Sequence, residues 1–134
     1  MREPRRGLFW SRGTLTRRSA YATWMTSREW LASRERWRAA WVTEHGSEPS
    51  CRVCGRPWSL RRDDLHHRSY ERLGHEHITN LVALCRRCHD KVHAVLEASP
   101  AWRRMDRVQA SDLIVARLRR AAASKQCTAG VAPT

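Results

Sequence analysis

Cysteine and histidine residues are concentrated in residues 51–93, at spacings that suit metal ions. Four of the five cysteines form two CxxC pairs, Cys51 with Cys54 and Cys85 with Cys88. Two such turns supply four thiolates that can close tetrahedrally around zinc, so the sequence predicts a structural zinc site. A disulfide scaffold is not expected, because the N-terminal residues contain no apolar stretch typical of an export signal.

The histidines form a second set with different chemistry. His89 and His93 are four residues apart, and on a helix both would project from one side and could share a divalent metal ion. His66 on a facing strand would be a third ligand, leaving positions open for a phosphate oxygen and water. Strand alternation turns His67 away from His66, which favours His67 as a general base. A purely structural role is the alternative for each histidine.

The charge of the chain indicates a polyanionic partner. Its 26 basic residues outnumber 13 acidic ones, the net charge is +13, and every basic residue except Lys91 and Lys125 is arginine. The planar guanidinium contacts phosphate oxygens in pairs, so nucleic acid is the favoured partner, with an acidic protein or a membrane surface as alternatives. No stretch approaches the roughly 18 apolar residues that span a bilayer, and we expect a cytoplasmic protein with no membrane partner.

Flanking elements must position these residues. Residues 1–20 are expected to be a basic, partly disordered arm. Residues 21–50 predict an amphipathic, tryptophan-rich helical region with Thr26 as N-cap, Glu29 completing a capping box and Gly46 as its end. Its tryptophans are expected to pack on the metal-binding module, which is too small to bury a core alone.

The module itself is predicted at residues 51–98. A strand is expected at 64–67, an irregular loop around Gly74, a return strand at 81–84 and a helix from about Arg86 to Glu97, closed before Pro100. A basic helix capped by Ser111 or Asp112 is expected within residues 99–120, and a disordered tail over residues 121–134.

Several short segments of the module together resemble a known family. The pattern is similar to the HNH endonucleases, in their CxxC-bearing branch from phages and bacteria. It runs through Leu65-His66-His67-Arg68-Ser69-Tyr70, Gly74-His75-Glu76, Asn80-Leu81 and Leu84-Cys85-Arg86-Arg87-Cys88-His89. The resemblance covers Cys51 to His93 closely. It implies a small α+β fold, the ββα-metal finger, with a four-cysteine zinc site and flanking helices.

The same resemblance implies roles for individual residues. His66, His89 and His93 would hold a catalytic divalent ion (Mg²⁺, Mn²⁺, Ni²⁺ or Zn²⁺), and His67 would be the general base. Asn80 would bond to the backbone and hold the loop of the base in shape. Arg68 is predicted nearest to the chemistry. Further arginines are expected to grip phosphates without reading sequence: Arg61, Arg62, Arg72, Arg86 and Arg87.

The leading interpretation is a metal-dependent DNA endonuclease of a bacterium or phage-infected cell, cutting by activated-water attack. One alternative is a zinc-stabilised nucleic-acid-binding module without catalysis. Another is an accessory nuclease of a phage packaging machine, active only with its protein partner.

Overall fold

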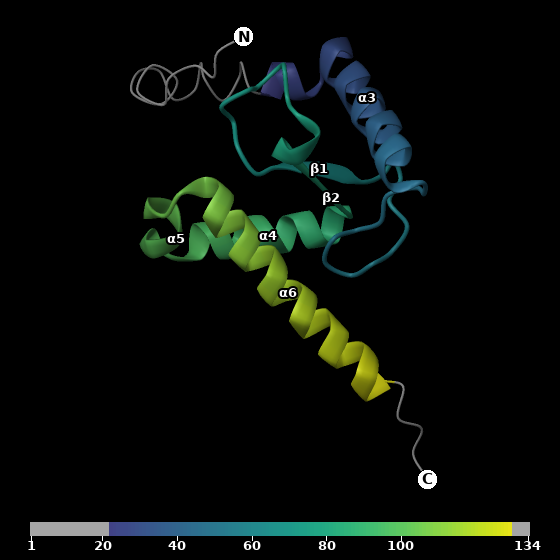
Figure 1. Cartoon of the computed structure of the whole chain (residues 1–134). Helices are drawn as coiled ribbons and strands as arrows, with labels where there is room; N and C mark the ends of the chain where they lie inside the picture. Colours follow the sequence, from purple (N-terminus) through teal and green to yellow (C-terminus); the bar gives the residue numbers. More distant parts are fainter. Residues whose placement is uncertain (1–21, 130–134) are drawn as a thin grey trace.

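A short two-stranded hairpin lies between helices in the computed structural model (Figure 1), which describes residues 22–129, with side chains as far as residue 126. The predicted arm at residues 1–20 lies outside the described residues. In chain order the elements are α3 (Arg28–His45), β1 (Asp64–His67), η1 (Ile78–Asn80), β2 (Leu81–Leu84), α4 (Arg86–Ala98), α5 (Pro100–Arg104) and α6 (Arg107–Ala129). The predicted small α+β fold is confirmed.

The register of the hairpin assigns each of its side chains to one of two faces. β1 and β2 pair antiparallel, with Leu65 opposite Ala83 and His66 opposite Val82. Side chains alternate along a strand, so cross-strand partners share a face and neighbours do not. One face therefore carries Leu65, His67, Leu81 and Ala83, and the other carries Asp64, His66, Val82 and Leu84.

The first face packs against α3. Trp30 and Trp37 of this helix are 3% and 4% exposed, and they form one apolar core with Trp58 and residues of the hairpin. The indole N–H of Trp37 donates to the carbonyl of Ile78 at 3.0 Å, while that of Trp58 donates to the carbonyl of Asp64 at 2.8 Å. The prediction that the tryptophans pack on the module is confirmed.

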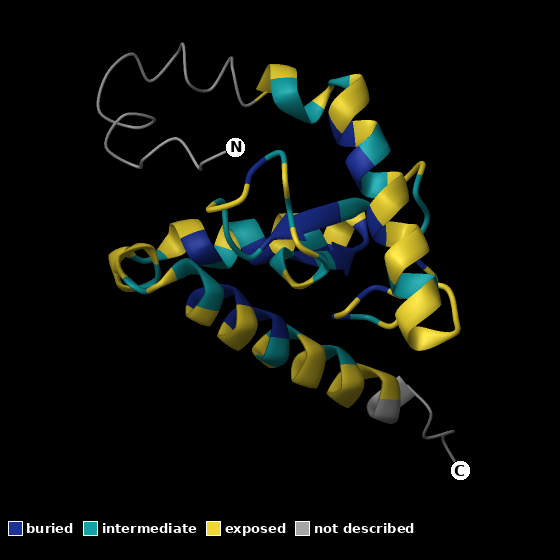
Figure 2. Cartoon of the chain, turned by 45° about the horizontal axis from the view of Figure 1, so that its top comes forward, coloured by how far each residue is buried: buried dark blue, intermediate teal, exposed yellow. Residues whose placement is uncertain are grey.

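The second face packs against α4, and α6 crosses α4 and also contacts the hairpin (Figure 1). Leu84 joins Val92 of α4 and Ala110 and Ile114 of α6 in a second core, and all four are fully buried. Burial follows one stripe along the first half of α6, whereas its second half is mostly exposed (Figure 2). None of the helices in the described part of the chain is long and apolar enough to cross a membrane.

The caps of α3 differ from the prediction at one end only. The N-cap is Ser27, whose hydroxyl oxygen accepts from the backbone N–H of Trp30 at 3.1 Å, and not Thr26. A short helical turn precedes it, and the Thr26 hydroxyl is used there, donating to the carbonyls of Ala22 and Thr23. Gly46 ends the helix as predicted, with φ of 71°, a left-handed conformation that favours glycine.

Predictions for the C-terminal region were wrong in two respects. α6 begins at Arg107, and Asp106 accepts from the N–H of Gln109 at 3.1 Å, so neither Ser111 nor Asp112 is the cap. The helix also continues to Ala129, in place of the disorder predicted from residue 121, because a run of alanines with high helix propensity follows the packed half. α5 was not predicted; it begins at Pro100, capped by Ser99.

We expect Trp30→Ala to lower the free energy of unfolding by about 3–5 kcal/mol, the usual cost of removing a buried aromatic side chain. The matched control is Leu31→Ala, since Leu31 follows in the same helix but is 52% exposed and should cost far less. Chemical denaturation followed by circular dichroism measures both. Equal losses for the two variants would contradict the packing of α3 described above.

Candidate metal centre and active site

Three histidines converge where β1 meets α4. One ligand nitrogen from each of His66, His89 and His93 lies within 4.8 Å of the others, and the Nε2 atoms of His89 and His93 are 3.0 Å apart. His66 is fully buried, whereas His89 and His93 are partly exposed. The cluster is therefore closed on the strand side and open to solvent on the helix side.

The remaining nitrogens of two of these rings have protein partners. His66 Nε2 shares a hydrogen bond with the Ser111 hydroxyl at 2.9 Å, and His89 Nδ1 lies 3.1 Å from the Asp64 carboxylate. His66 Nδ1 is buried and has no partner among the described residues. The cluster fits a divalent cation, which would bind one nitrogen of each ring. The second nitrogen of a metal-binding histidine is usually hydrogen-bonded to the protein, as His66 Nε2 is to Ser111 and His89 Nδ1 is to Asp64.

Burial favours the neutral form of two of the three rings, His66 and His93. Burial, reinforced by the positive charge of Arg107, lowers the pKa of His66 to about 2. Burial and the neighbouring His89 also lower the pKa of His93. Both rings are therefore neutral at physiological pH, which is the protonation state that ligates a metal.

His67 lies on the opposite face of β1, away from the three-histidine cluster. Its side chain is 2% exposed, and Nε2 is 3.2 Å from Glu76 Oε1. The ring stacks on Trp30 with a centroid distance of 5.0 Å and on Tyr70 at 5.3 Å. The structure thus separates His67 from the predicted ligands and places it in a buried pairing with a carboxylate.

The four paired cysteines form a second cluster, beneath the end of β2. Their sulfurs lie within 4.8 Å of one another, and the Sγ atoms of Cys54 and Cys85 are 3.9 Å apart. That distance is near the roughly 3.8 Å expected between sulfurs tetrahedrally bound at about 2.3 Å, and far from the roughly 2.05 Å of a disulfide. Gly55 closes the first turn at φ of 76°. The cluster could bind a metal ion.

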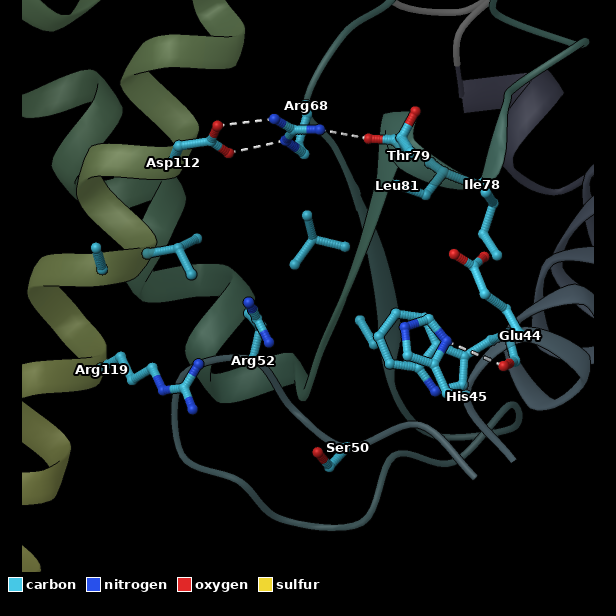
Figure 3. Close-up of a pocket in the computed structure, with 15 residues that line it drawn as sticks. Glu44, His45, Ser50, Arg52, Arg68, Ile78, Thr79, Leu81, Asp112 and Arg119 are labelled. Atoms are coloured by element: carbon cyan, nitrogen blue, oxygen red, sulfur yellow. Dashed lines mark hydrogen bonds and ion pairs between the residues drawn. The ribbon is translucent and has the colours of Figure 1, made fainter. Parts of the chain in front are cut away.

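Asn80 and Arg68 both make contacts within the protein. The Asn80 side-chain oxygen accepts from the His77 backbone N–H at 2.8 Å, which braces the loop before β2. Arg68 forms a two-pronged ion pair with Asp112 at 2.8 and 2.7 Å and donates to the Thr79 carbonyl at 2.6 Å (Figure 3). Its guanidinium therefore joins β1 to α6.

The arginines predicted to grip phosphates are all exposed, but they do not form one patch. Three of them line a shallow hollow beside the second CxxC pair: Arg62, Arg86 and Arg87. Arg72 lies in the loop between the strands, where its Nε donates to the His75 carbonyl at 3.2 Å.

Several residues around the histidines were not predicted to take part in the site, although Ser111 and Asp112 were named as candidate helix caps. Glu76 contacts His67. Three residues of α6 contact β1 or the residues that directly follow it: Arg107, Ser111 and Asp112. Glu76 offered a weak signal, as a carboxylate two residues after Gly74 in the loop. Ser111 offered none, because its contact with His66 spans 45 residues and depends on how α6 packs.

The family model described as HNH endonuclease matches residues 51–94. Residues 51–94 are thus similar to the HNH endonucleases. The matched residues include both CxxC pairs, the hairpin and the three clustered histidines, so the expected resemblance is confirmed. Neither the curated proteins nor the solved structures include a match to this chain. α3 and α6 both lie outside the residues that the HNH model matches.

We expect Cys88→Ser to lose the metal of the four-cysteine cluster and to unfold or aggregate, because an ion held by four thiolates typically contributes on the order of 10 kcal/mol. Elemental analysis with circular dichroism measures both effects. Cys127→Ser, outside the two CxxC pairs, is the control and should retain metal and helicity. A Cys88→Ser protein with full helicity and one fewer metal ion would contradict a structural role for the cluster.

Proposed function

We propose that this protein is a metal-dependent endonuclease that hydrolyses phosphodiester bonds of DNA. The observation that carries the proposal is the convergence of His66, His89 and His93, with one buried His66 nitrogen left without a protein partner. The match of residues 51–94 to the HNH endonuclease model supports a nuclease, and the net charge of +13 supports a nucleic-acid substrate.

Each metal would have a distinct task. A divalent ion at the three histidines would polarise the scissile phosphate and stabilise charge on the leaving oxygen. The protein holds two of those rings in place through Ser111 and Asp64, and it leaves the α4 side open for a phosphate group to approach. We assign zinc to the four cysteines, because an all-thiolate, tetrahedral and largely buried ligand set suits a closed structural site.

We assign the general base to His67. If Nε2–H is donated to Glu76, Nδ1 becomes the basic atom, as in other histidine–carboxylate pairs. Stacking between Trp30 and Tyr70 fixes the plane of the ring. Backbone contacts add to this, since Arg107 donates to the His67 carbonyl at 3.1 Å. This assignment requires that water reach a ring that is only 2% exposed.

Contacts with DNA are proposed for the exposed arginines around the HNH domain. Arg62, Arg86 and Arg87 are the strongest candidates because they share one hollow. Arg61 and Arg72 are exposed as well and would add to the attraction for phosphates. Arg68 is better assigned to positioning, since Asp112 and Thr79 already use its donors.

The second candidate is a nucleic-acid-binding module without catalysis. The burial of His67 on the α3 face favours it, because a ring packed between Trp30 and Tyr70 can serve structure alone. Under this alternative the HNH domain would bind DNA and still hold its metals.

A plasmid assay in Mg²⁺, Mn²⁺ or Ni²⁺ separates the two functions. We expect the wild type to cleave in at least one of these metals. His89→Ala should abolish cleavage by removing a ligand, and His67→Ala should slow it about 10²–10⁴-fold by removing the base. Thermal unfolding of each variant controls for folding, because His67 is buried.

Two results would contradict parts of the proposal. Wild-type protein that binds DNA and metal without cleaving would favour the binding module. A folded His67→Ala protein that cleaves at the wild-type rate, while His89→Ala does not cleave, would show that His67 is structural.

A further inference from the structure

Three residues of α6 contact β1 or the residues that directly follow it, although α6 lies outside the residues that the HNH model matches. Ser111 bonds to the ring of His66, Asp112 pairs with Arg68, and Arg107 donates to the His67 carbonyl and to the Tyr70 hydroxyl. Ser111 is the only one of the three whose partner is the side chain of a proposed metal ligand.

We propose that Ser111 is a positioning residue that completes the metal centre by fixing the ring of His66. The inference rests on the proposed metal site. A neutral imidazole has one N–H and one lone pair, so when Nε2–H donates to the Ser111 hydroxyl oxygen the lone pair is left on Nδ1. Nδ1 is the buried nitrogen without a protein partner.

The packing of α6 makes this contact rigid. Ser111 is fully buried, and its neighbours Ala110 and Ile114 are fully buried in the core beneath α4. The hydroxyl therefore has a fixed position relative to β1, and His66, like Ser111, is fully buried. Loss of the hydroxyl would leave Nε2 unpaired and the ring free to flip.

The test uses zinc-loaded protein titrated with Co²⁺, whose absorption spectrum distinguishes histidine from thiolate ligands. We expect Ser111→Ala to bind Co²⁺ about 10–100-fold more weakly than the wild type. Its zinc content and thermal stability should stay close to wild-type values. Asp112→Asn is the matched control: it alters the docking of the same helix turn without touching His66, and its Co²⁺ affinity should change little.

Equal affinities of wild type and Ser111→Ala would overturn the role of Ser111 while leaving the metal centre intact. Equal weakening by Ser111→Ala and Asp112→Asn would overturn it too, since helix docking in general would then explain both. Wild-type protein that takes up no Co²⁺ at a histidine site would overturn the proposed metal centre itself.

An independent observation concerns a cavity of about 540 Å³ between α3, β2 and α6 (Figure 3). Its walls are largely apolar, with Ile78, Leu81 and Val115 among them. Arg52 and Arg119 point into it from the side of α6 and the first CxxC turn, and neither has an acidic partner in the described part of the chain. Of the two carboxylates at the cavity, Asp112 is paired with Arg68, and Glu44 lies on the opposite wall.

We infer that this cavity binds an unpaired nucleotide of a DNA strand. Apolar walls can pack against the faces of a base without reading its hydrogen-bonding groups. The guanidiniums of Arg52 and Arg119, which have no acidic partner among the described residues, can bind the phosphate of the same nucleotide. The volume lies within the roughly 300–1,000 Å³ typical of small-molecule sites. Arg68, next to His67 in the chain, closes one end, so the bound nucleotide would lie near the active strand; this inference deepens the proposed function by naming its substrate.

Fluorescence anisotropy with a labelled single-stranded oligothymidine and a duplex of equal length tests the inference. We expect Arg119→Ala to weaken single-strand binding about tenfold, as loss of a charge-assisted hydrogen bond does. Arg120→Ala removes the same charge from the next residue of the helix, does not line the cavity, and should have a much smaller effect.

Equal effects of Arg119→Ala and Arg120→Ala would overturn the cavity as a site, because they would reflect general attraction only. Equal weakening of duplex and single-strand binding by Arg119→Ala would overturn the preference for an unpaired nucleotide. Plasmid cleavage by the same variants is scored separately, so that loss of this site is distinguishable from loss of nuclease activity.

Discussion

The hairpin of β1 and β2 has a helix against each of its faces, and this arrangement governs the rest of the structure. Two strands alone cannot bury a core, so each face depends on α3 or α4 for its apolar partners. Strand alternation then sends His66 toward α4 and His67 toward α3. The two neighbouring histidines therefore have different surroundings and different partners, and of the two only His66 lies beside His89 and His93.

Stability and chemistry are linked through the second core. Sulfurs of the two CxxC pairs pack with Leu84, Val92 and Ile114, so the four-cysteine cluster joins the loop before β1 to α4 and α6. The same packing places Ser111 against His66 and orients α4, which carries His89. Loss of the cluster would therefore disturb the histidine site as well, even though the two sites share no ligand.

Arginine serves two purposes here that the net charge does not separate. Arg68 and Arg107 are tied to acidic, carbonyl or hydroxyl partners and hold α6 against the active strand and its loop. Others, such as Arg87 and Arg119, are exposed without an acidic partner among the described residues, so they are available to phosphates. Only a part of the basic surface is therefore available for the proposed contacts with nucleic acid.

The sequence by itself determined the parts that depend on local spacing. The CxxC pairs, the i, i+4 histidines, the two strands and the following helix could all be read from short-range pattern, because their geometry is set within a few residues. The N-cap of α3 was predicted one residue early, because the neighbouring hydroxyls of Thr26 and Ser27 can both cap a helix. The predicted cap of α6 lies inside that helix, which begins at Arg107. Only the tertiary structure decided the contacts that span long stretches of chain, namely Ser111 with His66, Arg68 with Asp112, and Trp30 on His67. Those contacts depend on how α3 and α6 pack against the hairpin, and no local pattern encodes that packing.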